Sequence, residues 1–396
     1  MIDQQLILDK SQENYAEVLE LRRHLHQNPE LSFQEFKTTS LLFERLSKLG
    51  LDSLTKIDDI GIIGEIEGEG EGKTILLRAD TDALPIQELN QVDYASENNG
   101  VMHACGHDAH SAMLYGVVRI LADVRKSFPG KIRFVFQPAE ERIPGGAELM
   151  IKHKVLEGVD LAIGQHVMPS IPSGKFGICS GQFMASSDEF YIKIIGKGGH
   201  GAMPEKCIDP VLIGSHFITA AQQLVSRYAS PKTPSVLTFG RFEGLGAPNV
   251  IPDFVKLEGT FRTLDEQWRE EAIKKVVTLC ESLTKAMGGK CEIEVKRGYP
   301  YLHNDEKLFS RSLDHLQSFV GEENVLLPGI WMAAEDFARY SHEIPSLFYL
   351  LGVGNASLGI SSDLHTPTFN IDEEALKTGM GAMAWMAVNE LKSSES

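Results

Sequence analysis

The order of apolar segments along the chain is the feature that most restricts its fold. Three short apolar runs punctuated by Gly or Pro occupy the first half, namely KTILLRAD, KIRFVFQPAEE and DLAIGQHVMP. A helical pattern over about 108–124 lies among them. Alternation of buried strands with helices is typical of an α/β layer whose strands are largely parallel. We therefore expect an α/β fold for this part of the chain.

A different order of elements occupies residues 188–298. Helices are expected at 208–228 and 267–287, and the strands are EFYIKIIG, SVLTFGRF, FVKLEGTFR and KCEIEVKRG. This β-α-β-β-α-β order is that of ferredoxin-like domains. The chain then returns to α/β character with the strand SLFYLLGVG and a closing helix at about 373–391.

The length of the chain also favours two domains. With 396 residues it exceeds the size at which a single core keeps growing. We expect a discontinuous α/β catalytic domain over 1–187 and 299–396, and an inserted ferredoxin-like α+β domain over 188–298.

Composition excludes several classes of protein. Proteins that bind nucleic acid through its phosphates need a basic surface, and the net charge of −17 argues against one. We therefore expect no nucleic-acid partner. No apolar run approaches the length of a membrane span, and the first residues do not resemble a secretory signal. The five cysteines show no disulfide spacing and suit a reducing compartment. We therefore expect a cytoplasmic protein with no membrane partner.

The segment VMHACGHDAH carries an unusual density of metal-binding side chains. Cys105 and His107 stand one residue apart, so on an extended or turning backbone they can converge on one ion or on two adjacent ions. Each residue alone is more often a small core residue or a satisfied histidine. The cluster as a whole favours a metal site, because such sites need several convergent ligands.

Polar side chains follow each of the three apolar runs. They are Asp80 and Asp82, Glu140 and Glu141, and His166. An open α/β sheet places its site in the crevice beyond the carboxyl ends of its strands. Acidic residues at strand ends are often exposed to solvent and have no functional role. Here they occur in the same chain as the Cys-His segment, which indicates one shared site.

Five residues form the predicted ligand set: Cys105, His107, Glu141, His166 and His365. Five ligands exceed the need of one tetrahedral zinc and suit two ions that share a bridge, for which the Cys105 thiolate is the most economical choice. Glu140 could take a proton from a water acidified by such ions and hand it to a leaving amine. Asp80 is predicted to accept the free N–H of a metal-bound histidine.

Three further residues lie in the inserted domain. His200 stands on the glycine-rich loop GKGGHGAMP, where a substrate could come close to the ring and backbone. Asn249 and Arg262 follow in NVIPD and GTFR, and a guanidinium is a preferred clamp for a carboxylate. On composition alone each of the three is more often an ordinary solvated residue.

The ordered motifs resemble those of a known family. They are RRHLHQNPELSFQE, RADTDALP, HACGHDAH, QPAEE, GQHVMP, GKGGHGAMP, NVIPD with GTFR, AEDF and LHTPTFN. Together they resemble the dinuclear metal aminoacylase and carboxypeptidase family. The likeness is to its amidohydrolase branch of hippurate hydrolases, N-acetyl-amino-acid deacetylases and auxin-conjugate hydrolases, and it spans nearly the whole chain.

This resemblance implies two divalent ions per subunit and a smaller lid domain through which a homodimer forms. It further implies that Cys105 bridges the ions, that His107 and His166 complete one shell, and that Glu141 and His365 complete the other. Glu140 would be the general base and acid.

The resemblance also implies roles for the inserted domain. His200 would reach the partner subunit's site and stabilise the oxyanion, and Asn249 and Arg262 would hold the substrate carboxylate. Departures from the family pattern at Thr81, Glu205, Ala333 and Ala334 bear on substrate preference and affect no ligand.

The predicted function is hydrolysis of the amide bond of a small N-acyl-L-amino acid, of acetyl or benzoyl type, to a carboxylate and a free amino acid. A dipeptidase or carboxypeptidase acting on short peptides with the same residues is the closer alternative. A metal or ligand binder without activity is the alternative from another class, and the presence of Glu140 disfavours it. The ligand set suits zinc, manganese, cobalt or nickel alike.

Overall fold

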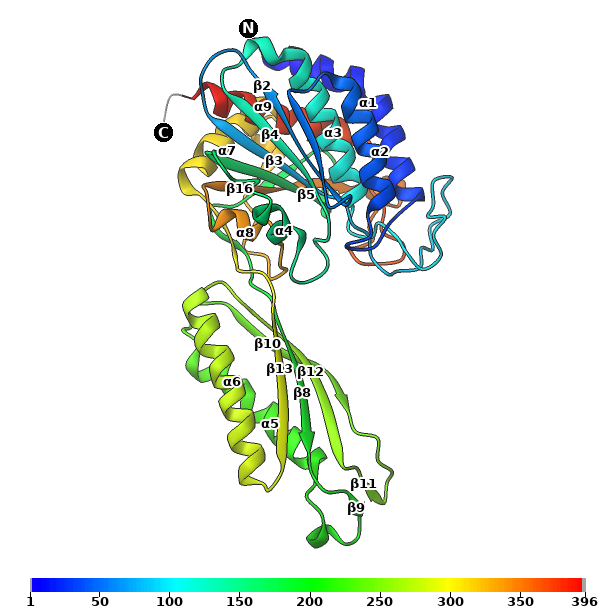
Figure 1. Cartoon of the computed structure of the whole chain (residues 1–396), viewed down its shortest axis with the longest axis vertical. Coiled ribbons are helices and arrows are strands. Elements are labelled where there is room, and N and C mark those ends of the chain that lie inside the picture. The colour runs from blue at the N-terminus through cyan, green and yellow to red at the C-terminus, as the bar shows by residue number, and fades with distance from the viewer. Residues whose placement is uncertain (1, 394–396) are drawn as a thin grey trace. The chain divides into compact units, whose positions relative to one another are not determined.

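The computed structural model describes residues 2–393, and the chain divides into two compact units (Figure 1). Unit 1 comprises the residues up to Phe183, His303–Gly329 and the residues from Asp336 onward. Unit 2 comprises Met184–Leu302 and Ile330–Glu335. The expected α/β fold with a second, inserted domain is confirmed. The boundaries expected at 187 and 299 stay predictions, and residues 1 and 394–396 lie outside the described part.

The core of unit 1 is an eight-stranded mixed sheet, visible in Figure 1. In spatial order its strands are β1 (Ser53–Ile57), β2 (Gly61–Glu67), β4 (Lys131–Gln137), β3 (Thr74–Asp80), β5 (Leu161–Pro172), β16 (Ser346–Gly354), β6 (Phe176–Ile178) and β15 (Val325–Leu326). The four central strands, from β4 to β16, run parallel. Strands β1, β2 and β6 pair antiparallel with their inner neighbours, so the expectation of parallel strands holds only for the centre.

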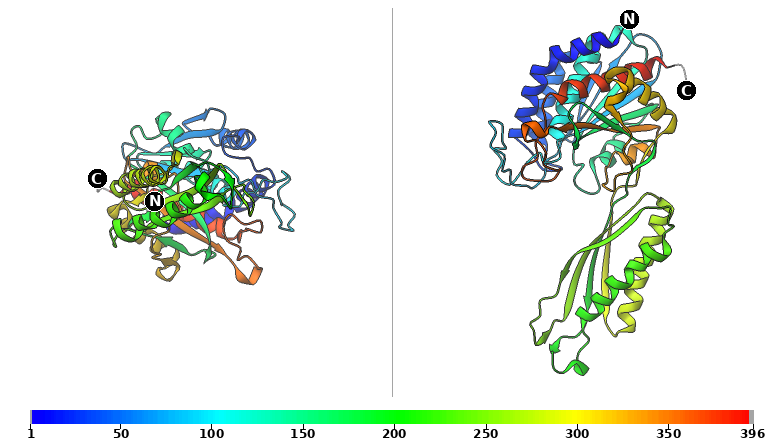
Figure 2. Two further views of the ribbon diagram at one scale, coloured as in Figure 1. Left: turned by 90° about the horizontal axis from the view of Figure 1, so that it is seen from below. Right: turned by 180° about the vertical axis from the view of Figure 1, so that it is seen from behind.

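Helices pack around this sheet, as the two sides in Figures 1 and 2 show. They are α1 (Gln4–Gln27), α2 (Phe36–Leu46), α3 (His107–Val124), α4 (Gly146–Lys152), α7 (Glu306–Val320), α8 (Ala338–Ser341) and α9 (Ala375–Lys392). Helices α1, α3 and α9 pack closely on one another: a Cβ on Gly116 of α3 would lie 2.8 Å from Val18 and 2.7 Å from Met380. The short strands β7 (Gly181–Met184) and β14 (Leu302–Asn304) lie where the chain passes between the units.

Unit 2 has the ferredoxin-like arrangement that its sequence predicts. Its sheet has the order β10 (Ser235–Glu243), β12 (Phe254–Thr263), β8 (Asp188–Ile195) and β13 (Lys290–Arg297), with every pair antiparallel. Alternate residues of β8, Phe190, Ile192 and Ile194, are buried in one core with α5 (Pro210–Gln223) and α6 (Glu266–Ala286). The helices therefore cover one face of the sheet.

Two details of the sequence prediction are corrected. His166 does not follow its strand but lies within β5, which continues to Pro172 because it pairs with β16 along this length. The helix expected over 208–228 is α5 followed by a π-turn at Leu224–Tyr228. No helix among the described residues is long and apolar enough to cross a membrane.

Candidate metal centre

The parallel pairing of β3 with β4 creates the platform for the site in unit 1. Asp80 lies opposite Gln137 in the register, so the residues just beyond the two strands emerge side by side. Asp82 receives the backbone N–H groups of Glu140 and Glu141, each at 3.0 Å. The turn that carries both glutamates is thus fixed to the end of β3.

Cys105 lies at the middle of the predicted ligand set. Its Sγ atom is 3.3 Å from Nε2 of His166 and 3.3 Å from Nε2 of His365. Nε2 of His365 is in turn 3.1 Å from Oε1 of Glu141. Residues up to 260 positions apart in the sequence therefore meet at one thiol.

The backbone conformation positions both Cys105 and His365 for their contact. Gly106, with φ of 86°, is the N-cap of α3 and turns the chain between Cys105 and His107. His365 also has a left-handed backbone, with φ of 61°, and its N–H donates to the carbonyl of Ala104 at 2.8 Å. A non-glycine residue persists there only where its surroundings hold it.

The two ring nitrogens of His107 have different surroundings: Nδ1 contacts Asp82 and Nε2 faces the other candidate ligands. Its Nδ1 lies 3.2 Å from Oδ1 of Asp82. Its Nε2 is buried and has no hydrogen-bond partner among the described residues. His166 is turned in the same way, since its Nδ1 lies 2.6 Å from the carbonyl of Val167. The Nε2 atoms of these two histidines and of His365 are the ones that face the cluster.

Electrostatics also favour a cation here. Burial raises the pKa of the Cys105 thiol well above its usual range, and the charges of Glu141 and Glu140 raise it further. Burial works to lower the pKa of His107, but the carboxylates of Asp80 and Asp82 outweigh it and raise this pKa to about 10. A divalent ion would balance this negative charge and would hold the thiol deprotonated.

The donor atoms fit metal ions. Two triads that each include Cys105, namely Cys105–His107–His166 and Cys105–Glu141–His365, have donor atoms within 4.8 Å of one another. Two donors bound to one ion at about 2.0–2.3 Å lie roughly 3.5 Å apart, close to the separations seen here. Nε2 of His107 makes no hydrogen bond among the described residues and lies 3.7 Å from Oδ2 of Asp80, so it is the atom that such an ion would satisfy.

Asp80 does not contact the Nδ1 of a predicted ligand. Its Oδ1 lies 2.6 Å from Nδ1 of His110, and its Oδ2 accepts from Arg78 at 2.7 Å. The other nitrogen of His110 accepts the N–H of Val167 at 2.9 Å, next to His166. Asp82, the second acid of RADTDALP, makes the contact with Nδ1 of a ligand histidine that was expected of Asp80, while Oδ2 of Asp80 lies 3.7 Å from Nε2 of the same ring, that of His107.

Glu140 lies beside the ligand cluster and is largely buried, with 7% of its surface exposed. One of its carboxylate oxygens lies within 4.8 Å of candidate donor atoms of His107 and Glu141. Its Oε1 also lies 3.4 Å from the backbone N–H of Asp336, in the AEDF motif. The carboxylate is therefore positioned to act on a group held at the cluster.

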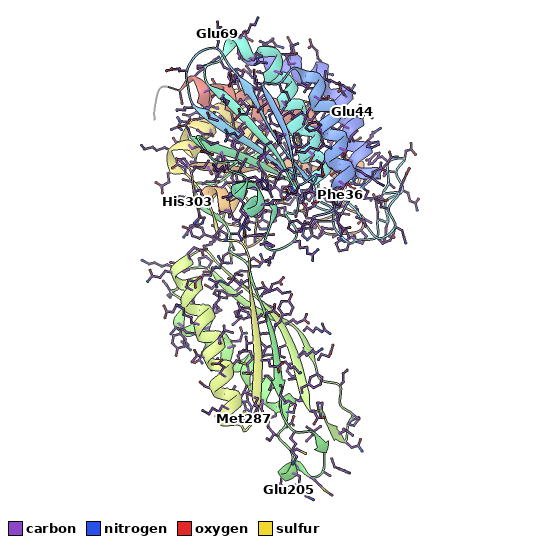
Figure 3. The ribbon with its side chains drawn as sticks, in the orientation of Figure 1. Phe36, Glu44, Glu69, Glu205, Met287 and His303 are labelled. Carbon is purple, nitrogen blue, oxygen red and sulfur yellow. The ribbon has the colours of Figure 1, made fainter. Side chains whose placement is uncertain are left out.

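The remaining predicted residues belong to unit 2. His200 lies in β9 (Gly199–His200), which pairs with β11 (Val250–Ile251), and the carbonyl of Asn249 accepts the N–H of Gly201 at 2.8 Å. Glu205, labelled in Figure 3, marks the end of unit 2 that carries these strands. Arg262 lies in β12, opposite Val236 of β10. Unit 2 thus brings His200 and Asn249 onto one exposed loop pair and leaves Arg262 on the main sheet.

A buried thiol, convergent imidazoles and adjacent glutamates define the class of a metal-dependent hydrolase. Residues 76–389 match Peptidase family M20/M25/M40, and the chain belongs to this family. The resemblance to its amidohydrolase branch is confirmed.

Individual relatives agree with this assignment. The chain is 45% identical over 292 residues to an N-acyl-L-amino acid amidohydrolase of Geobacillus stearothermophilus, covering 74% of this chain and 79% of that protein. It is 37% identical to thermostable carboxypeptidase 2 of Saccharolobus solfataricus, over 94% of each chain. A solved Bacillus subtilis structure described as a dinuclear metal binding peptidase from the M20 family superposes with a TM-score of 0.82 at 32% identity, covering 96% of this chain and 99% of that one.

Proposed function

We propose that the protein hydrolyses the amide bond of an N-acyl-L-amino acid and releases a carboxylate and the free amino acid. The observation that carries this proposal is the meeting of His166 and His365 at the Cys105 thiol, with Glu140 beside the cluster. The amidohydrolase named above, at 45% identity, supports the substrate class.

In this proposal the two triads would divide the predicted ligands between two divalent ions. Cys105 would bridge them, with His107 and His166 on one ion and Glu141 and His365 on the other. Zinc, manganese, cobalt and nickel all accept this mixture of sulfur, nitrogen and oxygen. Such ions, when bound, acidify water and polarise a carbonyl oxygen.

Glu140 moves the proton in this proposal. Its carboxylate accepts a proton from the water that attacks the acyl carbon, and later donates that proton to the amine as the C–N bond breaks. The turn around it is fixed by Asp82, which keeps the carboxylate close to the cluster. Removing this one group should therefore remove turnover and leave the ligands in place.

The direct test is the variant Glu140→Gln. We expect kcat on N-acetyl and N-benzoyl amino acids to fall by at least about a hundredfold, since general acid-base catalysis contributes on that order. Metal content, measured by elemental analysis of the purified protein, should stay at the wild-type value. Loss of the ions together with activity would contradict the assigned role and make Glu140 a ligand.

A second candidate substrate class is a short peptide. It is favoured by the likeness to a carboxypeptidase over 94% of the chain. A panel of acetyl, benzoyl and peptidyl amino acids compared by kcat/KM separates the two, because the proposal requires the acyl amino acids to be faster. A metal-loaded protein inactive on the whole panel would favour the non-catalytic binder.

The expectations for unit 2 stay predictions. We propose that His200 stabilises the oxyanion in the site of a second copy, that Asn249 and Arg262 hold the substrate carboxylate, and that residues 188–298 form the homodimer. Mixing His200→Ala with Glu140→Gln protein tests this, since mixed dimers should regain activity that neither variant has alone. If the mixture gains no activity, the role of His200 in the partner's site is contradicted.

The cytoplasmic location also stays a prediction, which fractionation of cells would check.

A further inference from the structure

The segment HQNPELSFQE, residues 26–35, contains none of the predicted ligands. Its second half, residues 30–35, docks against the ends of β3 and β4. The carbonyl of Glu30 accepts the N–H of Ala83 at 2.8 Å, and Leu31 forms a parallel bridge with Ala83. Ser32 Oγ donates to Oδ2 of Asp82 at 2.7 Å. These residues therefore contact the same Asp82 carboxylate that holds the turn with Glu140.

Three successive backbone N–H groups of this turn are held by two buried carboxylates. The N–H of Ala139 donates to Oε1 of Glu35 at 2.8 Å. The next two, of Glu140 and Glu141, donate to the two oxygens of Asp82 at 3.0 Å each. Successive N–H groups pointing to one side form a concavity that binds anions. Here the protein fills that concavity with its own side chains.

The backbone of the turn requires such support. Ala139 has φ of 55°, in the left-handed region that a residue with a Cβ rarely adopts. Such a conformation persists only where the surrounding structure holds it. Its N–H group donates to the buried carboxyl group of Glu35, so this side chain is placed to keep the turn in shape.

Glu35 itself is fully buried, at the start of α2 next to Phe36, which is labelled in Figure 3. Burial raises the pKa of Glu35 to about 8, and the nearby charge of Asp82 adds to the effect. Around neutral pH the neutral acid is therefore favoured. The oxygen of Glu35 that accepts the Ala139 N–H need not be charged. The amide oxygen of a glutamine, which has the same shape, should therefore accept this hydrogen bond as well.

We propose that Glu35 is a positioning residue that, through the N–H of Ala139, holds the 139–141 turn so that the Glu140 carboxylate faces the metal cluster. This inference rests on the proposed function for the role of Glu140. Glu35 belongs to none of the candidate donor groups among the described residues, so its loss should act on kcat through geometry and leave ligand number unchanged.

The test compares Glu35→Ala with Glu35→Gln in the full-length, metal-loaded protein. Glu35→Ala leaves the Ala139 N–H buried without an acceptor, and we expect kcat on the fastest acyl amino acid to fall about 10–100-fold, as for other supporting contacts of metal sites. KM should stay within about twofold and the metal content should not change. Glu35→Gln keeps the acceptor and should restore most of kcat.

A matched control lies in the same segment. The carboxylate of Glu30 caps α2 by accepting the N–H groups of Lys37 and Thr38, at 3.1 and 2.8 Å, and does not contact the 139–141 turn. Glu30→Ala should lower the melting temperature and leave kcat unchanged. If Glu35→Ala does not fold, Glu35→Asp replaces it, because a side chain shorter by one methylene cannot reach Ala139 and should show the same loss of kcat.

A readout independent of activity is amide hydrogen exchange of the metal-free chain. Exchange of a peptide covering 138–141 should be faster in Glu35→Ala than in the wild type, in Glu35→Gln and in Glu30→Ala. The inference would be overturned if Glu35→Ala changed neither kcat nor the exchange rate. It would also be overturned if kcat of Glu35→Gln were as low as kcat of Glu35→Ala. A wild-type chain that hydrolyses nothing would refute the proposed function instead, while the exchange result still decides whether Glu35 holds the turn.

Discussion

At the scale of single residues, the carboxyl group of Glu35 gives the molecule a measurable pH dependence. Its pKa is raised to about 8 in the folded protein, first by burial and then by Asp82, whereas its ordinary value is 4.5. Between these two values the unfolded chain ionises and the folded chain does not. Ionisation therefore favours unfolding, and this residue makes the wild type less stable as pH rises from about 4.5 to 8.

Glu35→Gln removes that ionisation. Relative to the wild type, the variant should gain in free energy of unfolding as pH rises from 5 to 8, by up to a few kcal/mol, and the difference should level off above pH 8. Urea unfolding at a series of pH values measures this. A difference that is constant or that shrinks over this range would show that Glu35 is ionised in the folded protein.

The sequence points to candidate donor residues more readily than to the residues that hold them. Cys105 and His107 stand in a dense segment whose residue types suggest metal binding. The contacts of Glu35 with Ala139 and of Asp82 with Glu140 join positions 104 and 58 residues apart, and no spacing in the sequence marks them. Of the two acids in RADTDALP, Asp80 is the one predicted from the sequence, whereas the structure places Asp82 against Nδ1 of His107, because nothing in the spacing of the two acids distinguishes them.

At the scale of elements, the start of α3 controls the geometry of the metal centre. Gly106 has φ of 86°, and a Cβ at this position would lie only 2.4 Å from Cγ2 of Val167, the neighbour of His166. Glycine is required there twice, for its backbone conformation and for the close approach of β5.

Gly106→Ala should therefore displace Cys105 and His107 relative to His166. We expect a loss of about 1–3 kcal/mol in the free energy of unfolding, as for overpacking, and metal affinity lower by about 10–100-fold. Competition with a chelator of known affinity measures the second effect. Wild-type metal affinity in this variant would show that the turn before α3 does not set the ligand geometry.

Periodicity predicts the elements of unit 2, whereas one capped helix of unit 1 is missed and the length of one strand depends on its pairing partner. The β-α-β-β-α-β order of unit 2 was predicted because each strand and helix has its own pattern. Helix α7 was not predicted, although Asp305 caps it and Leu308, Leu316 and Phe319 line its buried side. The extension of β5 past His166 depends on its partner β16, which lies about 180 residues further along the chain.

At the scale of the whole molecule, the two units have separate hydrophobic cores. The predicted ligands all lie in unit 1. Ions that bind the folded protein stabilise it by mass action, by about 2.7 kcal/mol for each ion at a concentration 100 times its Kd.

Chelation should therefore destabilise unit 1 selectively. With EDTA we expect faster hydrogen exchange in α3 and β5 and a lower melting temperature, while exchange in β8 and β12 of unit 2 stays the same. Mass spectrometry of peptic peptides resolves the two units. Equal loss of protection in both would contradict confinement of the ions to unit 1.

The central claim is that Cys105 bridges two divalent ions, and anomalous diffraction from crystals grown with zinc or manganese tests it most directly. We predict two peaks per chain, each at about 2.3 Å from the Cys105 sulfur for zinc, one beside His107 and His166 and the other beside Glu141 and His365. A single peak, or two peaks with Cys105 Sγ bound to only one of them, would contradict the account.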